Sequence, residues 1–415
     1  MFWLKETTRR WLCRRTFLLG CVLPTLGISA WIAWTRLETT RARYEADLSA
    51  HLGLRAVCSR LSFPRPGVTV FHDVRLSRGD SPACIVRDVT VEVDRTQEIT
   101  AITVDRVVIH VDDLLALWRP LWQQMERTNC GQLQVVVQSL TIEGIDRPLP
   151  VRLICRLGQS AVGQQLGLRL QSSDVQPVEL ATAAIRRGSA ASGDDTAVEL
   201  RSLCDLPCEL LSVFWPPAKR MGKKCGFQGL IRAEGSADGW RVAIEKDSLL
   251  SQIDLAALTG DKRFYGISGV AQLKIDGAQV SAGRLDVASG DFSVRPGIID
   301  RDVFEAAAKE LGLQLGKSRD NGLSAIEFGS MEAAFDVDST GVQIRGKCGE
   351  ENSGVLLADR SGRPLAFQKE PRKVPISALI RAVTPGSPEV LPASQQAAEL
   401  ARLLPLPSAE PGNLK

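Results

Sequence analysis

Residues 87–94 read RDVTVEVD, and residues 105–112 read DRVVIHVD. In the first stretch Val89, Val91 and Val93 alternate with polar residues, and the second stretch keeps the same period of two. Successive side chains of a β-strand point to opposite faces of its sheet, so each stretch predicts a strand with one apolar and one solvated face. The pattern therefore predicts a mainly β fold, an elongated and curled antiparallel sheet with a few short helices.

The same alternation recurs along the chain. Residues 133–137 keep it, whereas Leu140 and Ile142 have the opposite parity, which predicts a β-bulge near residues 138–139. Further apolar faces are predicted around residues 271–275 and 331–337. Together these positions form a candidate apolar groove: Val89, Val91, Val93, Leu133, Val135, Val137, Leu273, Ile275, Met331, Phe335 and Val337.

Composition and periodicity divide the 415 residues into seven stretches. The first three are a cytoplasmic basic tail (1–15), a transmembrane signal-anchor (16–35) and a helical stalk (36–53). They are followed by an N-terminal β-rich lobe (54–185), a linker with a helical patch (186–226), a C-terminal β-rich lobe (227–370) and a Pro-rich, partly disordered tail (371–415). One helix is predicted in each lobe, at residues 113–127 and 302–315, because apolar residues recur there every three or four positions.

The segment Thr16–Trp34, TFLLGCVLPTLGISAWIAW, carries no charge. At 1.5 Å per residue, roughly 19 helical residues reach about 30 Å, the thickness of the hydrocarbon core of a bilayer. Pro24 and Gly27 are tolerated in such a helix as a kink. Trp31 and Trp34 are expected at headgroup depth. The segment is therefore expected to anchor the chain in a membrane.

Basic residues flank this segment unequally. Five precede it and three follow closely: Lys5, Arg9, Arg10, Arg14 and Arg15, then Arg36, Arg41 and Arg43. This bias predicts a cytoplasmic N-terminus and an exported C-terminal part. Three alternatives are a cleaved signal peptide, a twin-arginine signal at residues 13–18 and a lipoprotein box at residues 18–21. Residues 28–30 are a poor cleavage site for the first.

The overall composition argues against several functions. Net charge is +3, with 51 basic and 48 acidic residues, which gives no electrostatic case for binding nucleic acid. The three histidines have no neighbouring ligands at zinc spacing, so we expect no metal and no cofactor. No constellation of nucleophile, base and orienting group stands out, so a non-catalytic protein is predicted.

Eight cysteines lie beyond the apolar segment. An even number is compatible with disulfides in an oxidising compartment. Cys204 and Cys208 are four residues apart and would share a helix face, where two half-buried thiols or one local bridge are both better explanations than a metal site.

Three tryptophans are candidates for a membrane-surface or gating role. Trp118 and Trp122 lie on one face of the predicted helix 113–127, which either plugs the open end of a sheet or lies on lipid. Trp215 precedes a basic run, Lys219 to Lys224, that could touch lipid headgroups or form a solvated loop.

Several stretches together resemble a known family. They are HLGLRAVCSRLSFPRPGVTVFHDVRL (residues 51–76), ACIVRDVTVEVD (83–94), ITVDRVVIHVD (102–112), GISGVAQLKIDGAQVSAGRLDVASGDFSV (266–294) and IEFGSMEAAFDVDSTGVQI (326–344). In the pattern of their strands, and in their position after an N-terminal anchor, they resemble AsmA-like proteins of the bacterial envelope. Residues 186–226 depart from the family pattern.

The resemblance implies a curled antiparallel sheet with an apolar concave face, anchored in the bacterial inner membrane and projecting into the periplasm. It also implies a role in envelope lipid transport or outer-membrane homeostasis, with no catalytic residues. An acyl chain in water costs about 0.8 kcal/mol per CH₂, so an apolar trough could hold phospholipid or another acyl-chain ligand. The alternative is a non-catalytic periplasmic scaffold or assembly factor for envelope proteins, whose apolar faces pack on one another.

Overall fold

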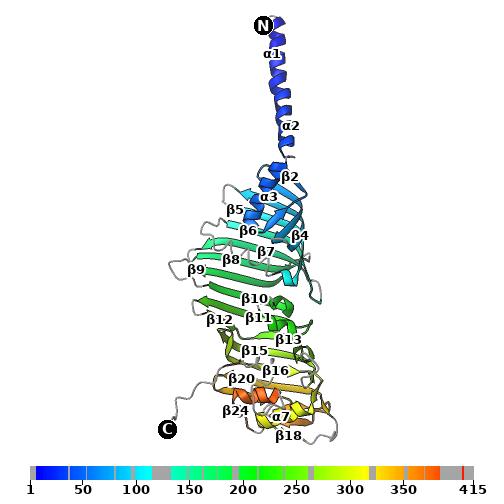
Figure 1. Cartoon of the computed structure of the whole chain (residues 1–415), viewed down its shortest axis with the longest axis vertical. Coiled ribbons are helices and arrows are strands. Elements are labelled where there is room, and N and C mark those ends of the chain that lie inside the picture. Colours follow the sequence, from blue (N-terminus) through cyan, green and yellow to red (C-terminus); the bar gives the residue numbers. More distant parts are fainter. Residues whose placement is uncertain are drawn as a thin grey trace. The chain divides into compact units, whose positions relative to one another are not determined.

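The computed structural model describes residues 6–35, 38–52, 54–78, 81–94, 99–114, 132–146, 149–160, 163–174, 176–188, 196–212, 215–236, 239–259, 266–316, 324–349, 354–368, 370–383 and 404–405. The fold is mainly β, with a large curled sheet, few helices and one apolar N-terminal helix, as the sequence predicts (Figure 1). The chain forms two compact units. The first comprises Met1–Ile109 and Asp113–Thr141, and the second comprises His110–Asp112 and Ile142–Lys415.

The N-terminal helix runs through α1 (Glu6–Phe17), the π-turn η1 (Leu18–Val22) and α2 (Leu23–Thr35). Arg10–Trp34, with a mean hydropathy of 1.8, is long and apolar enough to span a membrane, and no residue of its most apolar stretch is buried. The expected kink near Pro24 takes the form of η1, where the N–H of Leu23 reaches back to the carbonyl of Leu18. The hydroxyl of Thr25 donates to the carbonyl of Cys21 at 2.6 Å, which satisfies a backbone acceptor without water.

The first unit combines one more helix with a sheet. Its elements after α2 are α3 (Glu38–Leu52), β1 (Arg55–Val57), β2 (Arg60–Arg65), β3 (Val68–Arg78), β4 (Ser81–Asp94), β5 (Ile99–His110) and β6 (Gln132–Glu143), of which β5 and β6 end within the second unit. Strand β3 pairs with β1, β2 and β4, and β4 pairs with β5, all antiparallel. Register places Phe71 opposite Val89, and Val89 opposite Val104, so one face carries the apolar residues.

The predicted stalk, residues 36–53, needs correction, because α3 packs on the sheet. Leu48 is only 3% exposed. The carboxylate of Glu45 accepts the N–H of Cys58 at 2.8 Å, and the hydroxyl of Ser49 accepts the N–H of Ala56 at 2.9 Å. Polar composition suggested a free helix, but residues 40, 44 and 48 lie four apart and place one helix face against the strands.

The second unit contains most of the strands. Its strands are β7 (Leu149–Ser160), β8 (Gly163–Ser172), β9 (Glu179–Gly188), β10 (Thr196–Pro207), β11 (Gly226–Ser236), β12 (Gly239–Ile244), β13 (Ser248–Asp254), β14 (Ile267–Ser268), β15 (Val270–Ser281), β16 (Arg284–Val294), β17 (Gly297–Asp300), β18 (Gln314–Leu315), β19 (Ala325–Phe328), β20 (Ser330–Asp338), β21 (Gly341–Gly346), β22 (Val355–Ala358), β23 (Pro364–Phe367) and β24 (Lys373–Val374). Its helices and short turns are η2 (Val111–Asp113), α5 (Cys208–Leu211), η3 (Pro216–Arg220), α6 (Leu255–Thr259), α7 (Arg301–Leu311) and α8 (Ile376–Val383).

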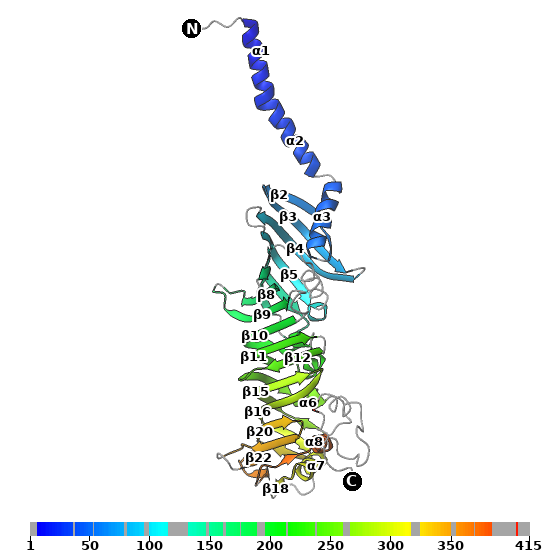
Figure 2. The ribbon, with the colours of Figure 1, turned by 90° about the vertical axis from the view of Figure 1, so that its left-hand side faces the viewer.

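Strand order in this unit largely follows the chain. Strands β7 to β11 pair in succession, β11 pairs with both β12 and β13, and these two pair with β15. The sheet continues through β16 and β20 to β21 and β22 (Figure 2). Strands β14, β17 and β19 form a separate small sheet. Register shifts interrupt β10, β13 and β15, and bulges of this kind bend a sheet.

Three predicted boundaries are wrong. Residues 186–226 do not form a linker between lobes, because β9 and β10 pair there within the sheet and the units divide near Thr141. The helix expected at 302–315 ends at Leu311, since Gly312 adopts a left-handed φ of 68°, and Leu315 lies in strand β18. The tail from residue 371 begins with ordered elements, β24 and α8. Of the predicted helix 113–127, residues 115–127 lie outside the described residues.

Candidate functional site

A continuous row of apolar residues crosses the sheet of the second unit. Residues that face each other on antiparallel strands project to the same side of the sheet. From β7 to β24, each step of the register joins one apolar residue to the next: Cys155, Leu168, Ala183, Leu200, Ile231, Ile244, Ala278, Ala288, Val337, Val342 and Val374. We call this the long row.

A second row runs two residues away on the same face. It joins β7 to β16 through Leu157, Leu166, Ile185, Val198, Ala233, Val242, Val280 and Leu285. No polar residue interrupts either row, although β15 carries two register shifts. The two rows together are the apolar ladder, a strip of aliphatic side chains that lies across the strands.

The opposite face of the same strands is polar. Arg232, between Ile231 and Ala233, lies 3.5 Å from the carboxylate of Glu199 and 2.8 Å from that of Glu245. Because neighbouring residues of a strand alternate between faces, these ion pairs lie away from the ladder. The sheet therefore has one charged and one aliphatic face, as the alternation in the sequence predicts.

The ladder differs in exposure along its length. On β10 to β12 all its members are half-buried: Val198, Leu200, Ile231, Ala233, Val242 and Ile244. We call these six residues the open segment. At the other end Val337 is 7% exposed and Val342 is 2% exposed. The part of the apolar face from β15 to β24 is the covered segment.

Helices account for the covered segment. Val337, Val342 and Val374 share a core cluster with Ile376 and Ile380 of α8 (Figure 2). Nearer the middle, Ile275 belongs to a larger core that contains two residues of α7, Val303 and Phe304. An amphipathic helix that lays its apolar stripe on a sheet removes both surfaces from water. The covered segment is therefore an ordinary hydrophobic core.

The residues of the predicted groove fall in three places. In the first unit Val89 is buried and Val91 half-buried, Val93 lies on β4 with a side chain outside the described set, Leu133 and Val137 are buried, and Val135 is half-buried. In the second unit Ile275 and Val337 are core residues, and Leu273, Met331 and Phe335 pack against the core. The predicted groove does not include the open segment: Val198 and Leu200 fell in the predicted linker, and its residues on β11 and β12 lay in the C-terminal lobe but were not among the candidates.

The tryptophan candidates are separated in the structure. Trp215 is 41% exposed beside η3, and the ammonium of Lys219 lies 3.4 Å from the carboxylate of Asp112. Trp118 and Trp122 lie outside the described residues. At the end of α2 the rings of Trp31 and Trp34 are 5.8 Å apart, and Trp31 also lies 6.1 Å from Phe63 of β2. The apolar helix thus contacts the sheet of its own unit through aromatic rings.

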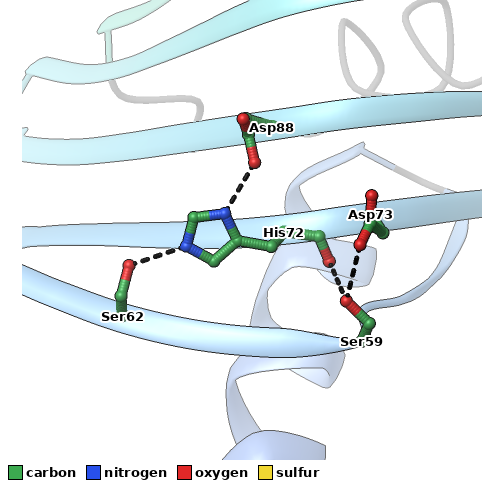
Figure 3. A network of polar contacts seen from close by, with 5 residues as sticks. All are labelled: Ser59, Ser62, His72, Asp73 and Asp88. Carbon is green, nitrogen blue, oxygen red and sulfur yellow. Dashed lines mark hydrogen bonds and ion pairs between the residues drawn. The ribbon is translucent and has the colours of Figure 1, made fainter.

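A polar network on the first unit has the order of a catalytic triad. His72 of β3 joins the carboxylate of Asp88 through Nδ1 at 2.6 Å and the hydroxyl of Ser62 through Nε2 at 2.9 Å (Figure 3). The hydroxyl of Ser59 donates to the carbonyl of His72 and to the carboxylate of Asp73. Acyl transfer requires in addition N–H donors aimed at a substrate oxygen.

The surroundings of this network fit a structural role. His72 faces Asp88 directly in the register, and Ser62 faces Val70, so the residues sit in paired strands whose backbone groups bond to each other. Side chains on one face of neighbouring strands commonly form such pairs, which stabilise a sheet. Among the described residues, no group of three His, Cys, Asp or Glu side chains could hold a metal ion.

Comparison with models of known protein families, with curated proteins and with solved structures finds no match for this chain.

Proposed function

We propose that this protein is anchored in a membrane by Arg10–Trp34 and binds lipid acyl chains along the apolar ladder. The observation that carries the proposal is the open segment, where aliphatic side chains from three neighbouring strands remain partly exposed. Two of them, Ile231 and Ile244, also pack against the larger core. Apolar surface left in water costs about 25 cal/mol per Å², and an acyl chain laid on it would remove that cost from both partners. No chemical step is required.

The dimensions of the open segment suit part of an acyl chain. Neighbouring strands lie about 4.8 Å apart, so the two steps from β10 to β12 extend over about 10 Å. One leaflet contributes about half of the 30 Å hydrocarbon core of a bilayer, or about 15 Å. The open segment is thus long enough for about two thirds of an acyl chain, since on β7 to β9 the ladder residues Leu157, Leu166 and Ile185 are already buried.

The orientation belongs to the same proposal. The excess of basic residues before the apolar helix supports a cytoplasmic N-terminus and a sheet on the exported side. With the resemblance to AsmA-like proteins, this points to the bacterial inner membrane, the periplasm and envelope lipid transport. Reporter fusions after Thr35 and after Asp195 should both behave as periplasmic, and a cytoplasmic signal from either would contradict this orientation.

Crosslinking at a single ladder position tests lipid binding. A photoreactive amino acid replaces Leu200 in the open segment, and in a control protein it replaces Arg201, the next residue, which projects to the opposite face. After illumination in cells, mass spectrometry of the purified protein should find a lipid adduct at position 200 and none at position 201. Equal adducts at both positions, or none at position 200, would contradict the proposal.

The alternative, a non-catalytic scaffold for envelope proteins, is favoured by the covered segment, whose side chains already have partners. The same experiment separates the two functions. A scaffold that docks another protein on the open segment gives a protein adduct at position 200, visible as a shift to higher mass on a denaturing gel.

A further inference from the structure

Two cysteines of the second unit meet where β10 ends and β11 begins. The sulfur atoms of Cys208 and Cys225 lie 2.6 Å apart, well inside the separation of two non-bonded sulfur atoms. The N–H of Cys208 donates to the carbonyl of Cys225 at 2.9 Å. Register pairs Leu206 with Phe227 and Pro207 with Gly226, so the cysteines are the next facing positions of β10 and β11.

Facing residues with such a backbone bond have Cα atoms about 5.5 Å apart, within the range that disulfides occupy. Cys208 is fully buried and Cys225 is 1% exposed, and both belong to a core with Phe227 and Leu250. The neighbouring Cys225 and burial raise the pKa of the Cys208 thiol, so a free thiolate is disfavoured at this position. The site suits a neutral, apolar, bonded pair.

We propose that Cys208 and Cys225 form an intramolecular disulfide in the mature protein. The two thiols lose two protons and two electrons as the S–S bond forms, and the disulfide of an exported thiol–disulfide exchange protein accepts both and leaves as a dithiol. The proposal rests on the exported orientation, because a reducing cytoplasm keeps such thiols reduced.

The bridge would close the loop of residues 209–224, which carries α5, η3 and the exposed Trp215. This loop leaves the sheet at the end of β10 and returns at the start of β11, the strands that carry Leu200 and Ile231. A covalent link at its base holds this end of the two strands in register. Cys204, four residues earlier, is instead directed to the carbonyl of Leu180 and serves as a control.

The nearby Met221 raises the alternative that the two cysteines bind a metal ion, which the experiment must distinguish from a disulfide. Its sulfur lies 3.9 Å from that of Cys225, and two thiolates with a thioether are ligands that Cu(I) prefers. Two cysteine sulfurs on one metal ion, each about 2.3 Å from it as in zinc sites, must move further apart than the sulfurs observed here. The geometry favours the disulfide.

The full-length protein is purified in detergent from the membrane fraction of a bacterial host, after acid quenching and alkylation under denaturing conditions. Trypsin cuts after Arg201, Lys219, Lys224 and Arg232. Mass spectrometry should then find peptide 202–219 linked to peptide 225–232 without reduction, and the link should persist in Cys204→Ser and disappear in Cys208→Ser. Alkylated Cys208 and Cys225 in a protein whose reporter fusions are periplasmic would overturn the disulfide and leave the orientation intact.

A second arm keeps the outcome independent of orientation. The purified protein is reduced and then equilibrated with mixtures of reduced and oxidised glutathione. Formation of the 208–225 link in preference to mixed disulfides supports the proposal even if the reporters are cytoplasmic. Persistent thiols, or a protein that retains copper and resists alkylation until a chelator is added, would overturn it.

Discussion

The open and covered segments carry the same kind of residue in the same register, and yet they have different surroundings. Val198, Leu200 and Ile231 are half-buried, whereas Ile275 and Val337 are buried in cores that also contain residues of α7 and α8. Aliphatic alternation decides which face of a strand is apolar, because the pleat has a period of two. Whether that face meets water depends on a helix that comes much later in the chain.

This difference matters for function, because only an uncovered apolar face can accept a ligand. The apolar side chains of the covered segment already pack in cores that contain residues of α7 and α8. The burial of this apolar surface stabilises the fold. The open segment retains part of its exposed apolar area. Four sets of substitutions test this contrast, beginning with the set that should have the largest effect.

A charge placed in each segment should have opposite consequences. Ile275→Asp buries a carboxylate without a partner, which costs several kcal/mol and should unfold the second unit. Leu200→Asp leaves the new carboxylate partly exposed to water, so the protein should stay folded while lipid adducts of a photoreactive residue placed at Ile231 are lost. Circular dichroism and urea unfolding report the fold. Equal loss of stability in the two variants would remove the distinction between the segments.

Weakening the cover should also destabilise the protein. Ile380 of α8 is 6% exposed in the core that contains Val337 and Val342, so Ile380→Ala should lower the free energy of unfolding by about 2–4 kcal/mol. The control is Leu379→Ala, the neighbouring and only partly buried residue, which should cost roughly half as much. Chemical denaturation of both variants measures the difference. A larger loss for Leu379→Ala would mean that α8 presents a different face to the sheet.

The ion pair between the covering helices should contribute less. Arg381 of α8 donates from Nε to the carboxylate of Glu310 of α7 at 2.7 Å, and the arginine side chain is 40% exposed. Solvent screens such pairs, so Glu310→Gln should cost about 0.5–1 kcal/mol and less at high salt. On the opposite face of β11, Arg232→Gln, which removes the pairs with Glu199 and Glu245, should have an effect of similar size. Urea midpoints at low and high salt test both, and a loss that high salt leaves unchanged would indicate packing instead.

The smallest expected effect is a dependence on pH at the covered end. Hydrogen bonds from Lys373 and Thr340 hold the pKa of Asp338 well below its usual value. Because the folded pKa lies below the unfolded one, this stabilisation is present above about pH 4 and is lost as the pH falls further. Asp338→Asn should therefore show a shallower fall in melting temperature between about pH 5 and pH 3 than the wild type. An identical decrease in melting temperature at low pH in the two proteins would exclude a role for this carboxylate.

Local patterns in the sequence predicted much of the sheet. The hairpin of Met331–Val337 and Val342–Ile344 is present as β20 and β21, where the carboxylate of Asp338 accepts the N–H of Thr340 in the turn. The bulk of the strands follows from alternation, because each signal is contained within about ten residues. The parity change after Val137 is also visible in burial, since Leu140 and Ile142 are both buried.

The errors arose where long-range packing decides the outcome. Helix α3 looks like a solvated stalk by composition, but its contacts with Ala56 and Cys58 form only after the strands return beneath it. Ile275 and Val337 of the predicted groove are as apolar as the residues of the open segment, so apolarity alone does not separate covered from open positions. Of the open segment, Val198 and Leu200 are separated from Ile244 by more than forty residues, so no local window contains the surface that they share.

The near-sequential pairing of β7 to β11 also bears on how the chain folds. Each of these strands pairs with the one before it, so the mean sequence separation between partners is small, and domains of low contact order form quickly. As the chain emerges from its N-terminal end, every new hairpin can add to an edge that already exists. Helix α8 comes last and must wait for β20, β21 and β24. Until it arrives, the covered end is a growing sheet edge with its aliphatic side exposed, the stage at which a nascent chain of this design is most vulnerable to aggregation.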